Sequence, residues 1–154
     1  MDVTLHMGAH RCATTSFQHY LRANAGWLAR QELGFWGPLR TRTGLMQGLL
    51  PQPGQIEPDA CPAQAGLRLQ RALDQASGLR RLIVSDENFL GTMRANLRSG
   101  ALYPGAGARA ARLGAAFGDR LGEVVLNIRA TDDYWASALG YSVARGHGLP
   151  RPGL

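Results

Sequence analysis

Residues 8–16 carry side chains and backbone groups of the kind that bind anions. They read Gly-Ala-His-Arg-Cys-Ala-Thr-Thr-Ser and join a short apolar run to a stretch with helical spacing of apolar residues. The first N–H groups of a helix have no partner inside it, and the helix dipole adds positive potential there. Thr14, Thr15 and Ser16 add hydroxyl donors, and Arg11 adds a cation. The segment predicts a loop that binds a phosphate-type group, with a strand–helix turn that binds nothing as the alternative.

The phosphate-binding loop of ATPases and kinases, G-x-x-x-x-G-K-[ST], fits this segment only in part. Gly8 fits the first Gly and Thr15 the last position, but Ala13 and Thr14 stand where the second Gly and the Lys belong. All 17 basic residues of the chain are Arg. The lack of Lys excludes the standard form of these enzymes and Schiff-base chemistry. A P-loop kinase relative remains a second alternative.

Arg129 and Ser137 form a second candidate pair near the other end of the chain. Arg129 follows the apolar run 124–128, and Ser137 lies in the helical pattern after it. If that run is a strand, Arg129 stands at its carboxyl end, where open parallel sheets bind ligands. By themselves the two residues carry little weight, because Arg129 could pair with Asp132 and Ser137 could pack inside its helix.

Together the two segments resemble the sulfotransferases that use 3′-phosphoadenosine 5′-phosphosulfate as donor. The loop of many relatives reads His-x-Gly-x-His-Lys-Thr-[Gly/Ala]-Thr-Thr-Ser-x-Gln. Residues 6–18 read His-Met-Gly-Ala-His-Arg-Cys-Ala-Thr-Thr-Ser-Phe-Gln, with Arg11 in place of Lys and Cys12 in place of Ser or Thr. Residues 129–137 resemble the family's Arg-x-x-x-Asp-x-x-x-Ser run.

The resemblance implies an enzyme that moves a sulfuryl group from 3′-phosphoadenosine 5′-phosphosulfate to a hydroxyl or amine acceptor, without a metal. It implies that Arg129 and Ser137 hold the 3′-phosphate of the donor, and that Arg11 stabilises the leaving phosphate. The residues that it places around the phosphosulfate are Gly8, Ala9, Arg11, Cys12, Ala13, Thr14, Thr15 and Ser16.

Such a transfer requires a group that takes the proton of the acceptor. Residues 85–89, Ser-Asp-Glu-Asn-Phe, resemble the Ser-Ser-Glu-Asn stretch of related sulfotransferases. Glu87 is therefore the first candidate for the base, although a carboxylate that caps a helix explains it equally well. His10, inside the loop, is the second candidate and could instead contact the phosphosulfate or shape the turn.

The pattern of apolar residues predicts an α/β fold with a parallel sheet flanked by helices. The resemblance makes this a P-loop nucleotide-hydrolase-like fold. The expected strands are 3–7, 82–84 and 124–128. The expected helices are 14–33, closed by Gly34, then 65–76, 108–117 and 131–145. Residues 37–66 are expected to form a long loop, and residues 146–154 a flexible tail.

The length of 154 residues favours one domain. Relatives carry further helices and a basic Gly-containing loop, so we expect residues 1–154 to be a truncated domain that corresponds to the N-terminal part of the family's fold. A non-catalytic nucleotide- or anion-binding remnant is therefore the first alternative function. An incomplete sheet exposes apolar surface and favours self-association.

Composition narrows the other expectations. The net charge of +6 permits an anionic partner, but no Arg run is interleaved with aromatic residues, so nucleic acid is not expected as a partner. There is no long apolar run and no signal-peptide pattern, which favours a cytoplasmic protein without a transmembrane segment. Cys12 and Cys61 lack the spacing of a metal site and fit a reducing compartment.

Overall fold

The computed structural model describes residues 1–50 and 62–148, which form an α/β fold around one parallel sheet. The sheet has 4 strands in the order β2-β3-β1-β4. In chain order the strands are β1 (Asp2–His6), β2 (Leu33–Trp36), β3 (Arg81–Ser85) and β4 (Leu121–Val125). The expected α/β class and the parallel sheet are confirmed.

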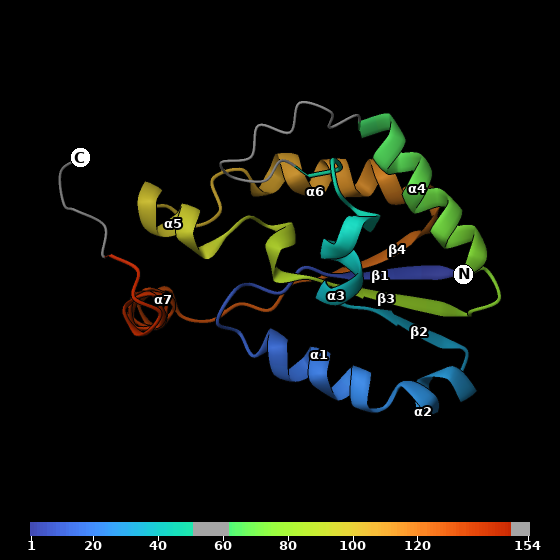
Figure 1. The fold of residues 1–154 in the computed structure, drawn as a ribbon, viewed down its shortest axis with the longest axis horizontal. Coiled ribbons are helices and arrows are strands. Elements are labelled where there is room, and N and C mark those ends of the chain that lie inside the picture. The colour runs from blue at the N-terminus through green and yellow to red at the C-terminus, as the bar shows by residue number, and fades with distance from the viewer. Residues whose placement is uncertain (51–61, 149–154) are drawn as a thin grey trace.

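Helices cover both faces of the sheet, as Figure 1 shows. Helices α4 (Pro62–Gln75) and α6 (Ala106–Phe117) lie on one face, and α1 (Thr14–Ala23) and α2 (Ala25–Arg30) lie on the other. Helices α5 (Met93–Ser99) and α7 (Thr131–Ala144) lie beyond the carboxyl ends of the strands. The shorter turns are α3 (Pro38–Arg40), the π-helical η1 (Thr41–Leu45), and the 3₁₀ turns η2 (Glu87–Phe89) and η3 (Gly118–Arg120).

The apolar core lies between the sheet and the α4–α6 layer. Alternate residues of β1 and β3 point into it, because successive side chains of a strand face opposite sides. Its fully buried members include Val3, Leu5, Leu69, Leu73, Leu82, Val84, Leu113 and Phe117. The α1 face of the same strands is more polar, since Thr4, His6 and Ser85 are buried there.

Two expected segments near the N-terminus differ from the structure. The expected helix 14–33 breaks at Asn24 into α1 and α2 and ends at Arg30. Its expected last residue, Leu33, begins strand β2, in which Gly34 pairs with Leu82 instead of closing a helix. The expected loop 37–66 contains α3, η1 and the start of α4, and its residues 51–61 lie outside the described part. Residues 33–36 pair with β3, so tertiary pairing decides their conformation.

Two further corrections fall in the second half of the chain. Helix α5 lies in a stretch with no expected element, and β4 begins and ends three residues earlier than the expected strand 124–128. Strand β4 is an edge strand, and its Val124 is 53% exposed. Of the expected tail, residues 149–154 lie outside the described part. Among the described helices, none combines the length and the apolar character needed to cross a membrane.

Candidate anion-binding site

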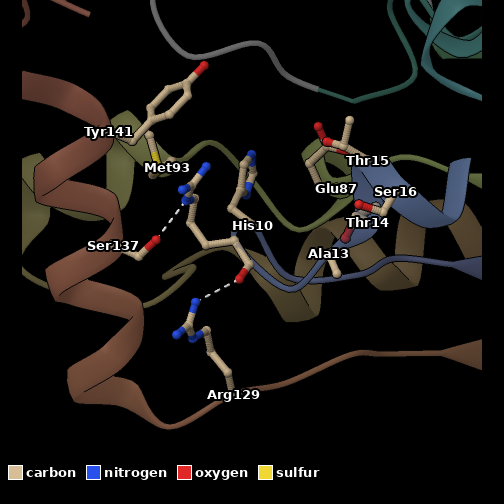
Figure 2. A pocket seen from close by; sticks show the side chains of 11 residues that line it. His10, Ala13, Thr14, Thr15, Ser16, Glu87, Met93, Arg129, Ser137 and Tyr141 are labelled. Carbon is tan, nitrogen blue, oxygen red and sulfur yellow. Dashed lines mark hydrogen bonds between the residues drawn. The ribbon is translucent and has the colours of Figure 1, made fainter. Parts of the chain in front are cut away.

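A pocket of about 380 Å³ opens at the carboxyl ends of the strands, between the start of α1, η2 and α7. Figure 2 shows Ser137 and Tyr141 on α7 at one side and Thr15, Ser16 and Glu87 at the other. The residues that line it are His10, Arg11, Ala13, Thr14, Thr15, Ser16, Glu87, Met93, Arg129, Ser137 and Tyr141. The structure thus brings the two candidate segments, from opposite ends of the chain, to one place.

The loop that follows β1 is tightly packed at its start. The backbone N–H of Met7 donates to the carbonyl of Val125 at 2.9 Å, and that of Ala9 donates to the carbonyl of Asn127 at 3.1 Å, which holds the loop against the end of β4 and the segment after it. A Cβ on Gly8 would lie 2.6 Å from Oγ1 of Thr14 and 2.9 Å from Cε1 of His6. Only glycine therefore allows the loop to turn this close to the first residue of α1.

Two non-glycine residues of the loop adopt left-handed backbone conformations. Arg11 has φ 65° and Ala13 has φ 58°. This conformation costs an L-residue about 1–2 kcal/mol. Ala13 occupies the place of the second Gly in the ATPase loop frame, so the structure preserves there the conformation that glycine favours.

Replacing Ala13 by Gly is expected to stabilise the fold by about 0.5–1 kcal/mol, since relief of left-handed strain exceeds the entropy that Gly adds to the unfolded chain. Urea denaturation of Ala13→Gly measures this difference. The matched control is Ala115→Gly, on the exposed face of α6, which should lose about 1 kcal/mol. A loss of stability in Ala13→Gly would contradict the expectation.

The start of α1 offers backbone N–H groups and two accessible hydroxyls to the pocket. The first N–H that bonds within the helix is that of Phe17, which donates to the carbonyl of Ala13 at 3.1 Å. The N–H groups of Thr14, Thr15 and Ser16 precede it and have no intrahelical acceptor. Thr14 is buried and its hydroxyl donates to the carbonyl of Ala9 at 3.2 Å, so it shapes the loop, while Thr15 and Ser16 are exposed.

Arginine side chains from the two candidate segments meet beside α7. Nε of Arg11 donates to Oγ of Ser137 at 2.8 Å, and Nη1 of Arg129 donates to the carbonyl of Arg11 at 3.0 Å. The guanidinium of Arg11 also lies over the ring of Tyr141, 5.0 Å from its centroid. Asp133 partly balances Arg129, at 3.5 Å. The sequence predicted Arg129 at the carboxyl end of a strand. In the structure the strand stops at Val125, and Arg129 lies in the segment beyond it.

Glu87, the first candidate for the base, is held by two partners. Its Oε1 accepts from Nη2 of Arg42 at 2.9 Å, and its Oε2 accepts from Nε2 of Gln18 at 3.1 Å. Burial acts to raise the pKa of Glu87, but the backbone N–H and Arg42 outweigh it and hold the pKa below its ordinary value. Glu87 is therefore an ionised carboxylate and a weak proton acceptor in this arrangement.

A chain of buried polar groups lies behind Glu87 on the α1 face of the sheet. Gln18 also donates to Oγ of Ser85 at 3.2 Å, and that hydroxyl lies 2.8 Å from Nδ1 of His6. Burial lowers the pKa of His6, with Glu87 opposing. The chain fixes Glu87 through residues of β1, α1 and β3, so the carboxylate is positioned by the body of the fold.

His10, the second candidate, has both ring nitrogens engaged inside the protein. Nδ1 lies 2.9 Å from the hydroxyl of Tyr103, and Nε2 lies 3.0 Å from Oδ1 of Asn88. Burial lowers the pKa of His10, with the bond to Asn88 opposing. A neutral ring with both nitrogens occupied is suited to fixing the loop, and not to taking a proton from an acceptor.

The remaining sequence candidates lie outside the pocket. Gly8 is buried beneath the loop, and Ala9 and Cys12 line a neighbouring apolar pocket of about 260 Å³. Burial raises the pKa of the Cys12 thiol, with Arg129 opposing. The sequence carries no local signal for Arg42 or Tyr103, whereas Gln18 belongs to the quoted loop pattern and could have been included.

Within residues 1–50 and 62–148, no three His, Cys, Asp or Glu side chains are grouped so that they could hold a metal ion. No protein-family model, curated protein or solved structure matches this chain significantly.

Proposed function

We propose that this chain is a sulfotransferase with a P-loop nucleotide-hydrolase-like fold, which transfers a sulfuryl group from 3′-phosphoadenosine 5′-phosphosulfate to a hydroxyl or amine acceptor. One observation carries the proposal. Arg11 in the loop after β1 is hydrogen-bonded at 2.8 Å to Ser137 on α7, and Arg129 contacts the same loop, so both halves of the candidate nucleotide site line one pocket.

The groups present fit a donor with two separate anionic ends. The start of α1 supplies backbone N–H groups and the hydroxyls of Thr15 and Ser16 at one end, where an anion gains from the helix dipole. Ser137 stands across the pocket from Thr15 and Ser16 (Figure 2), and Arg129 also lines the pocket. The two terminal nitrogens of Arg11 make no hydrogen bond to any described residue, and the guanidinium lines the pocket beside Ser137 and Tyr141. A guanidinium in that position can serve either anion.

In this proposal the side chains have separate tasks. The donor supplies the sulfuryl group, whose bond to the phosphate oxygen breaks as the bond to the acceptor oxygen or nitrogen forms. Arg11 and the α1 N–H groups stabilise the charge that develops on the phosphate. Glu87, across the pocket, orients the acceptor by accepting its hydrogen bond, and takes its proton only once the bond to Arg42 is loosened.

A second candidate function is nucleotide binding without transfer. It is favoured by a specific observation: in the described structure Glu87 is paired with Arg42 and Gln18, and both nitrogens of His10 are occupied. Neither residue is poised to take a proton. A chain of this kind would hold the nucleotide and leave the acceptor unreacted.

Calorimetric titration with adenosine 3′,5′-bisphosphate, with ATP as control ligand, tests the common part of both candidates. We expect selective binding of the bisphosphate, since Arg129 and Ser137 serve a 3′-phosphate that ATP lacks. Release of adenosine 3′,5′-bisphosphate from the donor is then measured with and without hydroxyl and amine acceptors. Acceptor-dependent release supports the transferase, binding without release supports the second candidate, and no binding by a folded chain contradicts both.

A further inference from the structure

Tyr103 approaches the anion-binding loop from a distant part of the chain. It lies between α5 and α6, and its hydroxyl accepts from the backbone N–H of His10 at 2.8 Å. The same hydroxyl lies 2.9 Å from Nδ1 of His10, and the two rings are stacked, with centroids 5.9 Å apart. One phenol thus contacts both the backbone and the side chain of the residue that precedes Arg11.

The backbone of Tyr103 is strained and is held in place by a buried side chain. Its φ is 46°, a left-handed value that a bulky residue adopts only when its surroundings impose it. Its N–H donates to Oδ1 of Asn96 at 3.0 Å, and Nδ2 of Asn96 donates to the hydroxyl of Tyr134 at 2.7 Å. Asn96 is fully buried. Helices α5 and α7 therefore both fix where the phenol of Tyr103 stands.

The hydrogen-bond pattern around His10 requires one tautomer. The phenol oxygen of Tyr103 already accepts the backbone N–H, so its proton is free to be donated to Nδ1 of His10. Burial raises the pKa of the Tyr103 phenol, which keeps that proton in place. Nε2 of His10 then carries the ring proton and donates it to Oδ1 of Asn88. Of the two neutral tautomers, only this one pairs both ring nitrogens with the atoms beside them.

We propose that Tyr103 is the positioning residue of the anion-binding loop: it holds His10 as the neutral Nε2–H tautomer and thereby fixes the left-handed turn at Arg11. The effect on ligand binding rests on the function proposed above, whereas the tautomer does not. Through Asn96 and Tyr134, Tyr103 also ties the loop to α7, the helix that carries Ser137. The two halves of the site are thus held in one geometry before any ligand binds, which lowers the cost of ordering them.

Long-range ¹H–¹⁵N spectra of the histidine-labelled chain at neutral pH test the tautomer directly. The signals of His10 are assigned by their loss in His10→Asn. We expect the Nε2–H form in the wild type and a mixture of both tautomers in Tyr103→Phe, which keeps the ring and removes only the hydroxyl. The Nδ1–H form or a charged ring in the wild type would overturn the proposal, even if Tyr103→Phe failed to fold.

Titration of the same variants with adenosine 3′,5′-bisphosphate tests the consequence. Tyr103→Phe should bind about fivefold more weakly, the order expected for one or two lost hydrogen bonds. Tyr20→Phe is the matched control, because Tyr20 on α1 is 65% exposed and stands outside the pocket; its affinity should stay unchanged. If Tyr103→Phe keeps the His10 tautomer and the bisphosphate affinity of the wild type, the hydroxyl of Tyr103 does not position the loop, and the proposal is wrong. If the wild type does not bind the bisphosphate, only the proposed function is contradicted. The tautomer of His10 would still test whether Tyr103 is a positioning residue.

Discussion

Arg129→Ala is expected to weaken the binding of adenosine 3′,5′-bisphosphate by roughly 10–100-fold, while leaving the binding of adenosine 5′-monophosphate within about twofold. Removing a charged hydrogen-bond donor costs about 1.5–3 kcal/mol, and each 1.4 kcal/mol is about a factor of ten in affinity. Arg129 and Ser137 both line the pocket, and the proposal assigns the 3′-phosphate to them. Adenosine 5′-monophosphate has no 3′-phosphate, so it loses no contact when Arg129 is removed.

Arg11→Ala should give a different pattern in the same titrations. Its guanidinium lines the pocket, and its Nε donates to Ser137. Removing it should therefore weaken both ligands. The two variants separate a general loss of positive charge from the loss of a specific phosphate contact. A general loss would weaken both ligands in both variants. A specific contact would make Arg129→Ala weaken only the bisphosphate and Arg11→Ala weaken both ligands.

The matched control is Arg112→Ala. Arg112 is exposed on α6 and is not among the residues that line the pocket, and its replacement removes the same charge from the chain. It should leave both affinities unchanged, which measures the contribution of net charge alone. Equal losses for both ligands in Arg129→Ala, or losses in Arg112→Ala as large as in Arg129→Ala, would contradict a dedicated 3′-phosphate site.

The central strands and the loop could be predicted because their signals are local. Residues of β1 and β3 are apolar runs buried on both faces of a sheet, the pattern that parallel strands require. The loop after β1 combines Gly8 with hydroxyl residues at a helix start, and the structure places most of these residues around one pocket. Short-range pattern and tertiary environment agree at these positions.

The edge strands were harder to predict because an edge strand is only half buried. Strand β2 contains Gly34 and begins three positions after the last residue of α2, Arg30, so its first residue, Leu33, falls inside the predicted helix 14–33. Strand β4 ends at Val125, and the apolar residues after it, including Ile128 at 80% exposure, lie on the surface. An apolar run marks a strand only where the fold buries it, and that depends on residues far away in the chain.

The partners of the candidate site could not be predicted for a related reason. Glu87 is held by Arg42, and His10 is held by Tyr103, which stands 93 positions away in the sequence. Single residues of this kind have no spacing pattern. They become visible only when the topology brings α5 and η1 to the carboxyl edge of the sheet, and they change the interpretation of both candidate bases.

Arg42→Ala is expected to destabilise the fold by about 3 kcal/mol, because it leaves a buried carboxylate without its counter-charge. Asp86 is 2% exposed, and Arg42 bonds it through Nε at 2.9 Å and through Nη2 at 2.5 Å. Thr41 and the backbone N–H of Asn88 remain as donors to Asp86, so the loss should stay near the low end for a broken buried pair. Urea denaturation at neutral pH measures the difference.

Two further variants make that expectation specific. Arg81→Ala breaks a surface pair with Glu123 at 3.7 Å, in which both side chains are about half exposed, and should cost under about 0.5 kcal/mol. In Arg42→Ala/Asp86→Asn the uncompensated charge is gone, so part of the lost stability should return. A double variant less stable than Arg42→Ala would show that Arg42 acts through packing of η1 and not through its charge.

The contact between Arg42 and Glu87 affects how the stability of the wild type responds to acid. Because the pKa of Glu87 is held below its ordinary value of 4.5, its contribution to stability is fully present above that pH and is lost as the pH falls through the lower folded value. Arg42 supplies much of this lowering, so Arg42→Ala should raise the pKa of Glu87, which carboxyl ¹³C shifts followed against pH would report. An unchanged pKa in a folded Arg42→Ala would mean that Gln18 and the backbone hold Glu87 unaided. A raised pKa would show that Arg42 keeps Glu87 ionised, and the proposed transfer would then require this contact to loosen.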